Sequence, residues 1–272
     1  MKEARIVFLG GGNMARAIVS GLIQDAYPAS KITVIDHKPT TCQGFITQYG
    51  VQASTSLDLS LATADILILA VKPQDAQAAC LPMQEAFKKH APLVISVMAG
   101  ITAKTLEQWL GPQQAVIRAM PNTPAAVQCG ATGLFANPYC TLTDKNQAES
   151  ILRATGVISW VQNEVDLASL TALSGSGPGY YFYFMEIMEA MAIKMGIPAE
   201  TAHLFTVQTA YGAAKLALES PSPFAALRAQ VSSGGGSTAA AIASMQHHDL
   251  TNLLEEAMIA CRNRALELAQ GS

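Results

Sequence analysis

The sequence contains few charged residues. Asp, Glu, Lys and Arg make up only 14% of its 272 residues, whereas soluble domains typically contain about 25%. Lys and Arg total 17 against 20 Asp and Glu, so no basic excess is available to neutralise phosphates. We therefore expect no nucleic-acid partner. A low charged fraction beside 50% hydrophobic residues predicts that part of the surface is buried between subunits.

Long hydrophobic runs and paired cysteines are also missing. No apolar stretch approaches the ~18 residues that span a bilayer, so we expect no membrane partner and a soluble, cytoplasmic protein. The cysteines are odd in number and lack a C-x-x-C pair, which argues against a disulfide framework and a zinc knuckle. We expect no metal site, and interpret the cysteines as reduced, mostly buried thiols: Cys42, Cys80, Cys129, Cys140 and Cys261.

A glycine cluster follows the first apolar segment. Residues 5–9 predict a buried strand, and the next six are Gly-Gly-Gly-Asn-Met-Ala before a helical apolar pattern begins. The spacing places Gly10 at a tight turn, Gly12 where backbone approaches a pyrophosphate, and Ala15 where helix and strand pack closely. A second strand, 32–35, ends at Asp36. Strand, turn, helix and second strand together predict a dinucleotide site.

The first half of the chain alternates apolar strands with helical stretches. Continuous apolar strands are typical of a parallel sheet covered on both faces, and we place them at 5–9, 32–35, 66–71, 93–98, 115–119, 131–135 and 157–161. This pattern predicts an α/β fold with an N-terminal Rossmann-type doubly wound sheet. Strand signals stop after residue 164, and the expected helices are 166–173, 178–195, 199–219, 223–230 and 238–269. The predicted domains are a dinucleotide-binding domain, 1–164, and an all-α domain, 165–272.

A second glycine run, 231–238, reads Val-Ser-Ser-Gly-Gly-Gly-Ser-Thr. Five helical residues follow at once, so Ser237 or Thr238 is expected at the N-cap. Free amides of a helical first turn bind a carboxylate or phosphate without any basic side chain. The alternative is an ordinary helix cap preceded by a flexible linker.

Two other patterns have structural interpretations. Methionines recur at helical spacing and form one face, which indicates core or a subunit interface: Met185, Met188, Met191 and Met195. Ser174 and Ser176 lie in a glycine-rich stretch before Pro178. Because neither serine has the glycine that a nucleophile elbow requires two residues before it, we expect a packing turn before a proline-initiated helix.

Five short segments occur in a distinctive order. They are residues 8–15, 70–73, 118–124, 173–178 and 231–238, with the sequences FLGGGNMA, AVKP, RAMPNTP, LSGSGP and VSSGGGST. Together, over nearly the whole chain, they resemble pyrroline-5-carboxylate reductases. The resemblance implies reduction of the cyclic imine Δ1-pyrroline-5-carboxylate to L-proline, the last step of proline biosynthesis, by hydride from NADPH or NADH. It also implies a helical substrate-binding and dimerisation domain and a homodimer, with larger assemblies of dimers left open.

The resemblance assigns roles to matching positions. The pyrophosphate would lie on Gly10, Gly11, Gly12, Asn13 and Met14. The path from adenosine to nicotinamide would be lined by Ala70, Val71, Lys72, Pro73, Met98, Ala99 and Gly100, with Asn122 near the nicotinamide. For Lys72 the alternative is a surface ion pair.

The substrate carboxylate would bind backbone amides of the second glycine run, formed by Val231, Ser233, Gly235, Gly236, Ser237 and Thr238. The Thr238 hydroxyl would hydrogen-bond the ring nitrogen and is the catalytic candidate. Glu164 matches a position near the substrate, with an interdomain ion pair as the alternative.

The chain departs from the family pattern at two positions. Asp36 stands where a small or amide residue is common, and an acidic residue there accepts ribose hydroxyls of NAD and repels a 2′-phosphate. His37 and Lys38 follow directly and could hold that phosphate. NADPH is therefore the expected cofactor, with NADH as the alternative. Gly234 stands where proline is usual.

Two other functions fit parts of the pattern. A β-hydroxyacid dehydrogenase-like oxidoreductase would share the fold but needs a catalytic lysine after the linker, and Lys194 is the only lysine between residues 156 and 215. A non-catalytic nucleotide-sensing protein would keep Gly10 and Gly12 but would not need an anion-binding turn.

Overall fold

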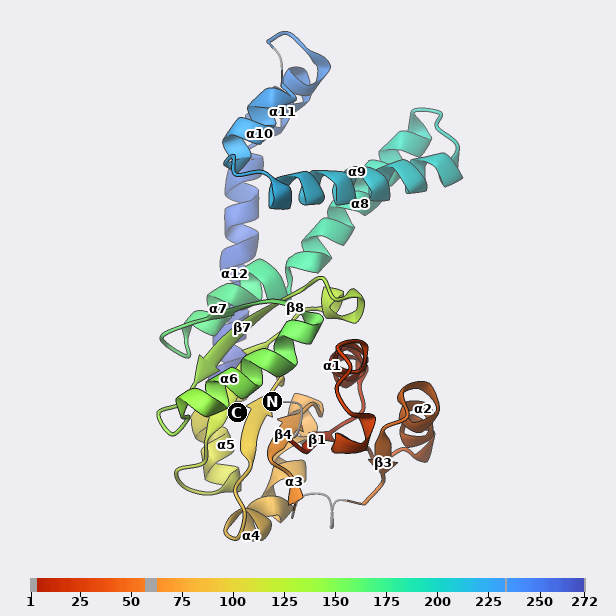
Figure 1. Ribbon diagram of the computed structural model, residues 1–272. Coiled ribbons are helices and arrows are strands. Elements are labelled where there is room, and N and C mark those ends of the chain that lie inside the picture. The colour runs from red at the N-terminus through yellow and green to blue at the C-terminus, as the bar shows by residue number, and fades with distance from the viewer. Residues whose placement is uncertain (1–3, 57–62, 233, 272) are drawn as a thin grey trace. The chain divides into compact units, whose positions relative to one another are not determined.

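A computed structural model describes residues 4–56, 63–232 and 234–271 (Figure 1). The chain divides into two compact units. We call Met1–Ser176 with Cys261–Ser272 the sheet unit, and Gly177–Ala260 the helical unit. This division falls after Ser176, whereas the predicted domain boundary is at residue 164. The last part of the final helix also belongs to the sheet unit.

The sheet unit is built on eight described strands in the order β3-β2-β1-β4-β5-β6-β7-β8. Their bounds are Ile6–Leu9 (β1), Ile32–Ile35 (β2), Gln52–Ser54 (β3), Ile66–Leu69 (β4), Leu93–Ser96 (β5), Val116–Met120 (β6), Gly130–Ala136 (β7) and Gly156–Trp160 (β8). Seven match the predicted strands, and the Rossmann-type α/β prediction is confirmed. The strand β3 was not predicted because it is a short, partly exposed edge strand without an apolar run.

The sheet is mostly parallel, and the expectation of parallel strands is wrong for one pairing, that of β6 with β7. The six strands β3-β2-β1-β4-β5-β6 are parallel to one another, whereas β7 is antiparallel to β6, and β8 is parallel to β7. A parallel crossover needs about a dozen residues or more. The connection 121–129 contains only the 3₁₀ turn Thr123–Val127 and returns the chain directly. The amino end of β7 therefore lies at the same sheet edge as the carboxyl end of β6.

Helices cover both faces of the sheet (Figure 1). Apolar side chains of α1 (Asn13–Gln24), α2 (Pro39–Tyr49) and α6 (Leu142–Leu152) pack on one face in a cluster that includes Phe8 and Ile68. Those of α3 (Ala76–Cys80), α4 (Gln84–Phe87) and α5 (Ala103–Leu110) pack with Leu67 and Leu69 in a second cluster. Alternate residues of one strand thus enter opposite cores, which explains the unbroken apolar runs.

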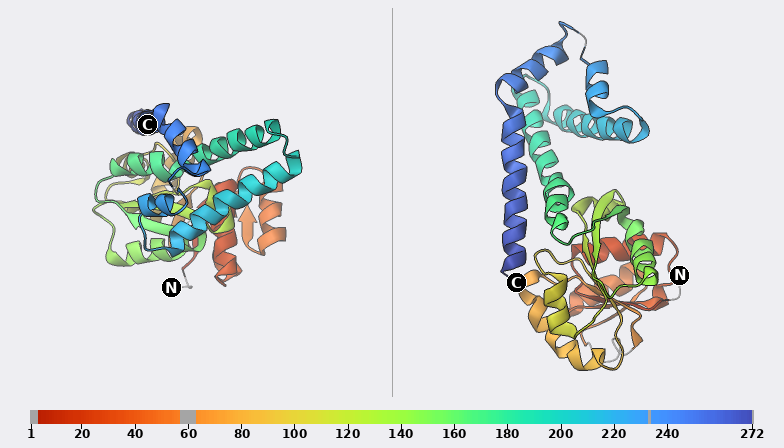
Figure 2. Two further views of the ribbon diagram at one scale, coloured as in Figure 1. Left: turned by 90° about the horizontal axis from the view of Figure 1, so that it is seen from above. Right: turned by 90° about the vertical axis from the view of Figure 1, so that its left-hand side faces the viewer.

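The helical unit begins with α8 (Gly177–Lys194) and α9 (Ala199–Glu219), joined by a short turn (Figure 2). Then come α10 (Phe224–Gln230), α11 (Ser237–His247) and α12 (Leu250–Gln270). The single helix predicted over 238–269 is wrong: Asp249 has φ 55° and separates two helices.

The helix predicted over 166–173 also differs. The helix α7 is Asp166–Leu170, and a π-helical turn, Thr171–Gly175, continues it. The Thr171 and Ser174 hydroxyls donate to carbonyls four residues earlier, which competes with regular helical bonding. Pro178 follows at the start of α8, as predicted.

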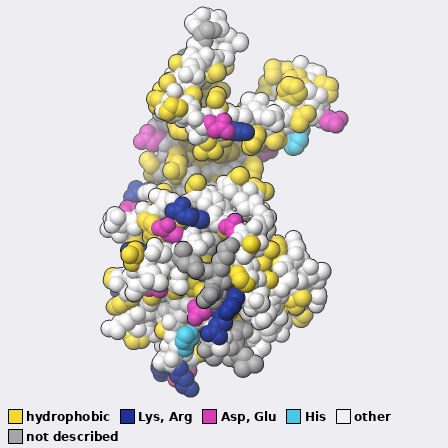
Figure 3. Space-filling view, viewed as in Figure 1, with side chains coloured by type: hydrophobic (Ala, Val, Ile, Leu, Met, Phe, Trp, Pro, Cys, Tyr) yellow, Lys and Arg dark blue, Asp and Glu magenta, His cyan; other side chains and the backbone are white. Residues whose placement is uncertain are grey.

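The helical unit exposes large apolar side chains. Ala202 is its only buried hydrophobic residue among those described. Exposed ones include Tyr181, Phe182, Tyr183, Phe205 and Tyr211, and hydrophobic surface is extensive over these helices in Figure 3. On the methionine face, Met188 is 47% and Met195 71% exposed. This face is not core within one chain, so subunit interface is the interpretation that remains.

The cysteines are less buried than predicted. Cys42 and Cys80 are buried, Cys140 and Cys261 are half-buried, and Cys129 is exposed. Burial raises the pKa of Cys80 to about 12, which keeps that thiol protonated. All five cysteines are free thiols in the structure.

Within the described ranges, no helix combines the length and apolar composition needed to cross a membrane. In the same ranges, no three His, Cys, Asp or Glu side chains gather as a metal ion would require. His247 and His248 are both exposed.

Candidate cofactor and substrate sites

The first glycine turn connects β1 to α1 at the carboxyl edge of the sheet. Gly10 has φ 100°, and a Cβ there would lie 2.6 Å from the Ala70 carbonyl oxygen. Only glycine fits this position, because both the backbone angle and the close strand approach exclude a side chain. Gly12 is the N-cap residue of α1, and because it has no side chain, no side-chain acceptor caps the first amides of the helix. The first amides of α1 are therefore available to an anion.

A cavity of about 710 Å³ opens over this turn. It brings together the turn, the end of β2 and the end of β4. Predicted cofactor residues in its wall are Gly10, Gly11, Gly12, Asp36, His37, Lys38, Ala70, Val71 and Lys72. Thr41 and Thr55 also line it and were not predicted.

The Asp36 carboxylate is held by backbone donors. Its Oδ2 accepts from the Gly11 amide at 2.9 Å, and its Oδ1 accepts from the Lys38 amide at 2.9 Å. The side chain is only 13% exposed. Asp36 thus ties the end of β2 to the glycine turn while lining the cavity.

Two lysines and a histidine also line the cavity. His37 and Lys38 are exposed, and His37 Nδ1 lies 3.7 Å from Asp36 Oδ1. Lys72 is exposed just after β4 and has no ion-pair partner among the described residues. The surface ion pair considered as its alternative role is absent from this part of the chain.

Other predicted cofactor residues lie outside this cavity wall: Asn13, Met14, Pro73, Met98 and Ala99. Met98 is 3% exposed and packs in the core. Asn122 is also buried, and both the oxygen and the nitrogen of its side-chain amide are hydrogen-bonded within the protein. It accepts from the Ala131 amide at 2.9 Å and donates to the Ser174 carbonyl at 3.0 Å. Asn122 therefore fastens β7 and the π-helical turn to the end of β6.

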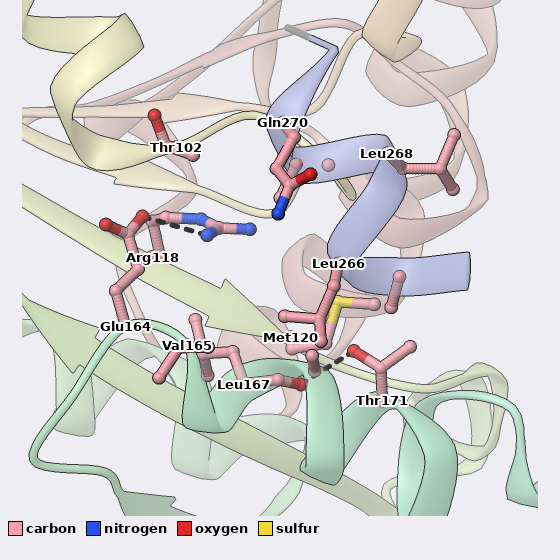
Figure 4. A pocket seen from close by; sticks show the side chains of 14 residues that line it. Thr102, Arg118, Met120, Glu164, Val165, Leu167, Thr171, Leu266, Leu268 and Gln270 are labelled. Atoms are coloured by element: carbon pink, nitrogen blue, oxygen red, sulfur yellow. Dashed lines mark hydrogen bonds and ion pairs between the residues drawn. The ribbon is translucent and has the colours of Figure 1, made fainter. Parts of the chain in front are cut away.

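A second cavity of the sheet unit, about 360 Å³, is walled by β6, α7 and the last turns of α12 (Figure 4). Gly100, Arg118, Glu164, Leu268 and Gln270 contribute to it. Arg118 Nη1 donates to Glu164 Oε1 at 2.8 Å. The Arg118 side chain is 9% exposed and that of Glu164 26%.

Glu164 makes a second contact, with α5. Its Oε1 also accepts from the Ala103 amide, at 2.7 Å. Ala103, Arg118 and Glu164 all belong to the sheet unit. The ion pair of Glu164 is thus internal to that unit, whereas the alternative considered from the sequence was an interdomain pair.

The second glycine run lies in the helical unit. Val231 ends α10, Gly235 has φ 77°, and Gly236 is the N-cap of α11 with no side-chain cap. The predicted N-cap at Ser237 or Thr238 is wrong, since these are the first helical residues. Both are exposed. Ser233 lies outside the described residues.

This turn leaves backbone donors free. The first intrahelical bond of α11 runs from the Ala240 amide to the Gly236 carbonyl. The preceding amides of the first turn therefore have no helical acceptor and suit a carboxylate. The segment 231–238 carries no basic side chain. The Ser232 hydroxyl is buried without a partner in the described structure.

Comparisons with known proteins give the family. A model described as pyrroline-5-carboxylate reductase dimerisation matches residues 164–268. A pyrroline-5-carboxylate reductase of Pseudomonas aeruginosa is 39% identical over 270 residues, covering 99% of this chain and 98% of the relative. The chain belongs to the pyrroline-5-carboxylate reductase family. The Escherichia coli member is 32% identical, covering 98% of this chain and 99% of its own.

Solved structures of family members agree with the fold. A pyrroline-5-carboxylate reductase from Coxiella burnetii has a TM-score of 0.93 and 41% identity, covering 98% of both chains. One from Plasmodium falciparum with NADP bound has a TM-score of 0.86 and 25% identity, covering 99% of both chains. Residues 5–100 match a model described as NADP oxidoreductase coenzyme F420-dependent. This span contains the first glycine turn and Lys72.

Sequence reasoning missed several cavity residues in this reductase family member, among them Thr55, Thr41 and Arg118. Thr55 follows the unpredicted strand β3, so nothing placed it beside Asp36. Thr41 lies in the first turn of α2, where a threonine has no distinctive pattern. Arg118 belongs to one of the segments that carry the family resemblance, but its pairing with Glu164 spans 46 residues and has no local sequence signal.

Proposed function

We propose that this protein reduces Δ1-pyrroline-5-carboxylate to L-proline with hydride from NADPH, and with NADH as a second donor. The observation that carries the proposal is a pair of complementary anion sites. One is the glycine turn and cavity of the sheet unit, and the other is the amide-rich turn before α11. Relatives with the corresponding activity in their names match both units over nearly their whole lengths.

The cavity of the sheet unit fits a dinucleotide. A side chain at Gly10 would fill the close approach between the turn and Ala70, and the free amides of α1 suit a pyrophosphate. Lys72 and Lys38 supply positive charge at the cavity wall, and the His37 imidazole lies in the same wall. A bound nicotinamide cofactor would supply the hydride, whereas the protein supplies binding and orientation.

The turn before α11 fits the substrate carboxylate. We propose that the amides of Gly235, Gly236 and Ser237 hold it, together with Val231 and Ser233 of the same segment. The Thr238 hydroxyl would hydrogen-bond the ring nitrogen. A preorganised set of backbone donors fixes an anion without reorganisation during the reaction.

The reaction requires no strong general base. A protonated imine is electrophilic, so hydride addition to its carbon neutralises the charge and leaves an amine that solvent protonates. The residues of this chain therefore act mainly by holding the reactants in near-attack geometry. This accounts for the absence of an acid–base pair from the described residues around Thr238.

We also propose a homodimer as the basic assembly of this homo-oligomeric protein. The exposed aromatic and methionine side chains of α8 and α9 supply the surface that a second copy would cover. A cytoplasmic location and the lack of a nucleic-acid partner stay predictions from composition.

The test is oxidation of NADPH, and separately of NADH, by purified protein with Δ1-pyrroline-5-carboxylate. We expect imine-dependent oxidation and formation of proline. Oxidation of 3-hydroxyacids with NADP⁺ would instead indicate a β-hydroxyacid dehydrogenase-like enzyme. Tight NADPH binding with neither turnover would indicate a nucleotide sensor.

A further inference from the structure

The loop between β5 and α5, residues 97–102, is held from three sides. Near its start, the Ser96 hydroxyl accepts from the Met98 amide at 3.3 Å. At its middle, Gly100 has φ 77°, and a Cβ there would lie 3.3 Å from Leu268 of α12. At its end, Thr102 caps α5 by accepting from the Thr105 amide. The proposed nicotinamide path includes Met98, Ala99 and Gly100 of this loop.

Glu164 fixes the end of this loop. Its Oε1 accepts from the Ala103 amide, the first amide of α5. A carboxylate is favourable at a helix N-terminus, where amides lack helical acceptors. With Thr102, Glu164 therefore satisfies two of the donors at the start of α5.

Arg118 holds Glu164 in place. Arg118 lies on β6, is 9% exposed, and has Glu164 as its ion-pair partner. A buried guanidinium needs an anionic partner, because an unpaired buried charge is strongly destabilising. One carboxylate oxygen thus joins β6 to α5, and the loop is tied to the sheet through it. Figure 4 shows this pair at the wall of the second cavity.

We propose that Glu164 is a positioning residue for the cofactor: it sets the loop 97–102 against the nicotinamide and does not contact the substrate. This inference rests on the proposed function. It replaces the sequence-based assignment of Glu164 to the substrate. The reason is that its bonded oxygen serves Ala103 and Arg118, both within the unit that holds the cofactor cavity.

The test compares Glu164→Gln and Glu164→Ala with the wild-type protein. Glutamine keeps an acceptor for the Ala103 amide, whereas alanine removes it. We expect the Kd for NADPH, measured by nucleotide fluorescence, to rise modestly for Glu164→Gln and on the order of 10-fold for Glu164→Ala. The KM for the imine at saturating NADPH should stay within about 2-fold of the wild type, since no substrate contact is lost.

A matched control is available at Glu149. Its carboxylate also accepts from two donors, Arg153 and Trp160, and is 29% exposed. Glu149→Ala should leave the Kd for NADPH unchanged, because Glu149 and its two donors neither belong to the loop 97–102 nor bond to it. An equal rise in both alanine variants would overturn the proposal.

A second variant separates positioning from stability. Glu164→Ala leaves Arg118 buried and unpaired, so it should lower the melting temperature. Arg118→Met with Glu164→Ala removes that charge and should recover stability without recovering NADPH affinity. The proposal fails if the double variant binds NADPH as tightly as wild type, or if only the KM for the imine rises. Nucleotide binding needs no imine, so a wild-type protein that binds NADPH but does not reduce the imine would refute the proposed function separately.

Discussion

The sheet unit and the helical unit hide their apolar side chains differently. The sheet unit has two cores, one on each face, in which Phe8, Ile68 and Leu67 are 0% exposed. Among the described residues of the helical unit, Ala202 alone is a buried hydrophobic, while Phe182 and Tyr183 are more than half exposed. The sheet unit therefore buries its apolar side chains within one chain. The helical unit leaves most of its large apolar side chains exposed unless a second subunit covers them.

This difference explains the low charge of the chain. A surface that is covered in the assembly cannot carry the usual density of Lys, Arg, Asp and Glu, because burying a charge without a partner is unfavourable. The methionine spacing in α8 belongs to the same surface. Assembly and folding of the helical unit are therefore expected to be one process, as in obligate dimers.

The comparison is tested most severely by removing the helical unit together with the segment Cys261–Ser272 of the sheet unit. A chain cut after Ser176 should be a monomer that binds NADPH but has no reductase activity, because the whole cofactor cavity lies within residues 9–79. Mass by light scattering and NADPH titration check this. A dimeric fragment would place the interface in the sheet unit instead.

A charge on the apolar surface should break the assembly. Met188→Glu on α8 should weaken self-association on the order of 100-fold or more, since leaving a charge buried and unpaired costs about 3–5 kcal/mol. Leu81→Glu in the sheet unit is the control, since Leu81 is 46% and Met188 47% exposed. Sedimentation at several concentrations measures both. Equal effects would mean that exposure alone does not mark the interface.

The helical unit is also proposed to supply the hydroxyl that hydrogen-bonds the ring nitrogen of the substrate, that of Thr238. Thr238→Ala should lower kcat/KM roughly 2- to 13-fold, because a neutral hydrogen bond contributes about 0.5–1.5 kcal/mol. The Kd for NADPH should not change. Ser244→Ala, on the same helix and exposed, is the control. An unchanged kcat/KM would remove Thr238 from the site.

The sheet unit is proposed to set the cofactor preference. Asp36→Asn removes the charge and keeps an oxygen for the Gly11 amide, so NADPH should gain several-fold over NADH, as expected for about 1 kcal/mol of surface Coulomb energy. Asp36→Ser should shift the ratio likewise, with weaker binding of both cofactors if the Gly11 contact matters. The measurement is the ratio of kcat/KM for NADPH to kcat/KM for NADH, in the wild type and in each variant. No shift in either variant would assign the preference to His37 or Lys38.

The smallest effect concerns the turn before α11. Gly234→Pro should lower the KM for the imine roughly 2- to 5-fold, since a compatible proline contributes about 0.4–1 kcal/mol by restricting the unfolded turn. Gly234 lies outside the positive φ region, and no atom lies within 4 Å of an added Cβ. Gly235, with φ 77°, is the contrasting position. Gly235→Pro should raise the KM, because proline cannot adopt that φ.

Local requirements made much of the fold predictable. Gly10 and the residues around it could be placed because a strand, a tight turn and a helix follow each other within a few residues. The strand runs were equally clear, since each is buried on both faces. Strand direction is not encoded in an apolar run, so the antiparallel pairing of β6 and β7 was missed. The break at Asp249 was missed because it has no glycine or proline.

The candidate site was predictable only where its chemistry is local. Both glycine turns were found from their own sequences, although the cap proved to be Gly236. The contacts of Asp36 with Gly11, of Asn122 with Ser174, and of Arg118 with Glu164 join residues far apart in the chain. Such pairs arise from the topology of the sheet and have no sequence pattern of their own.

The sheet unit is discontinuous, because Leu268 packs against Gly100 after the chain has passed through the whole helical unit. During synthesis the strands of this unit emerge early, yet the last turns of α12 reach the ribosome exit only after α8 to α11. Domains generally fold as units as they emerge. Here the loop at Gly100 packs against Leu268, which is synthesised 168 residues later. A nascent chain would therefore hold a folded sheet with one edge uncovered, and the last turns of α12 would cover it only after the whole helical unit had been made.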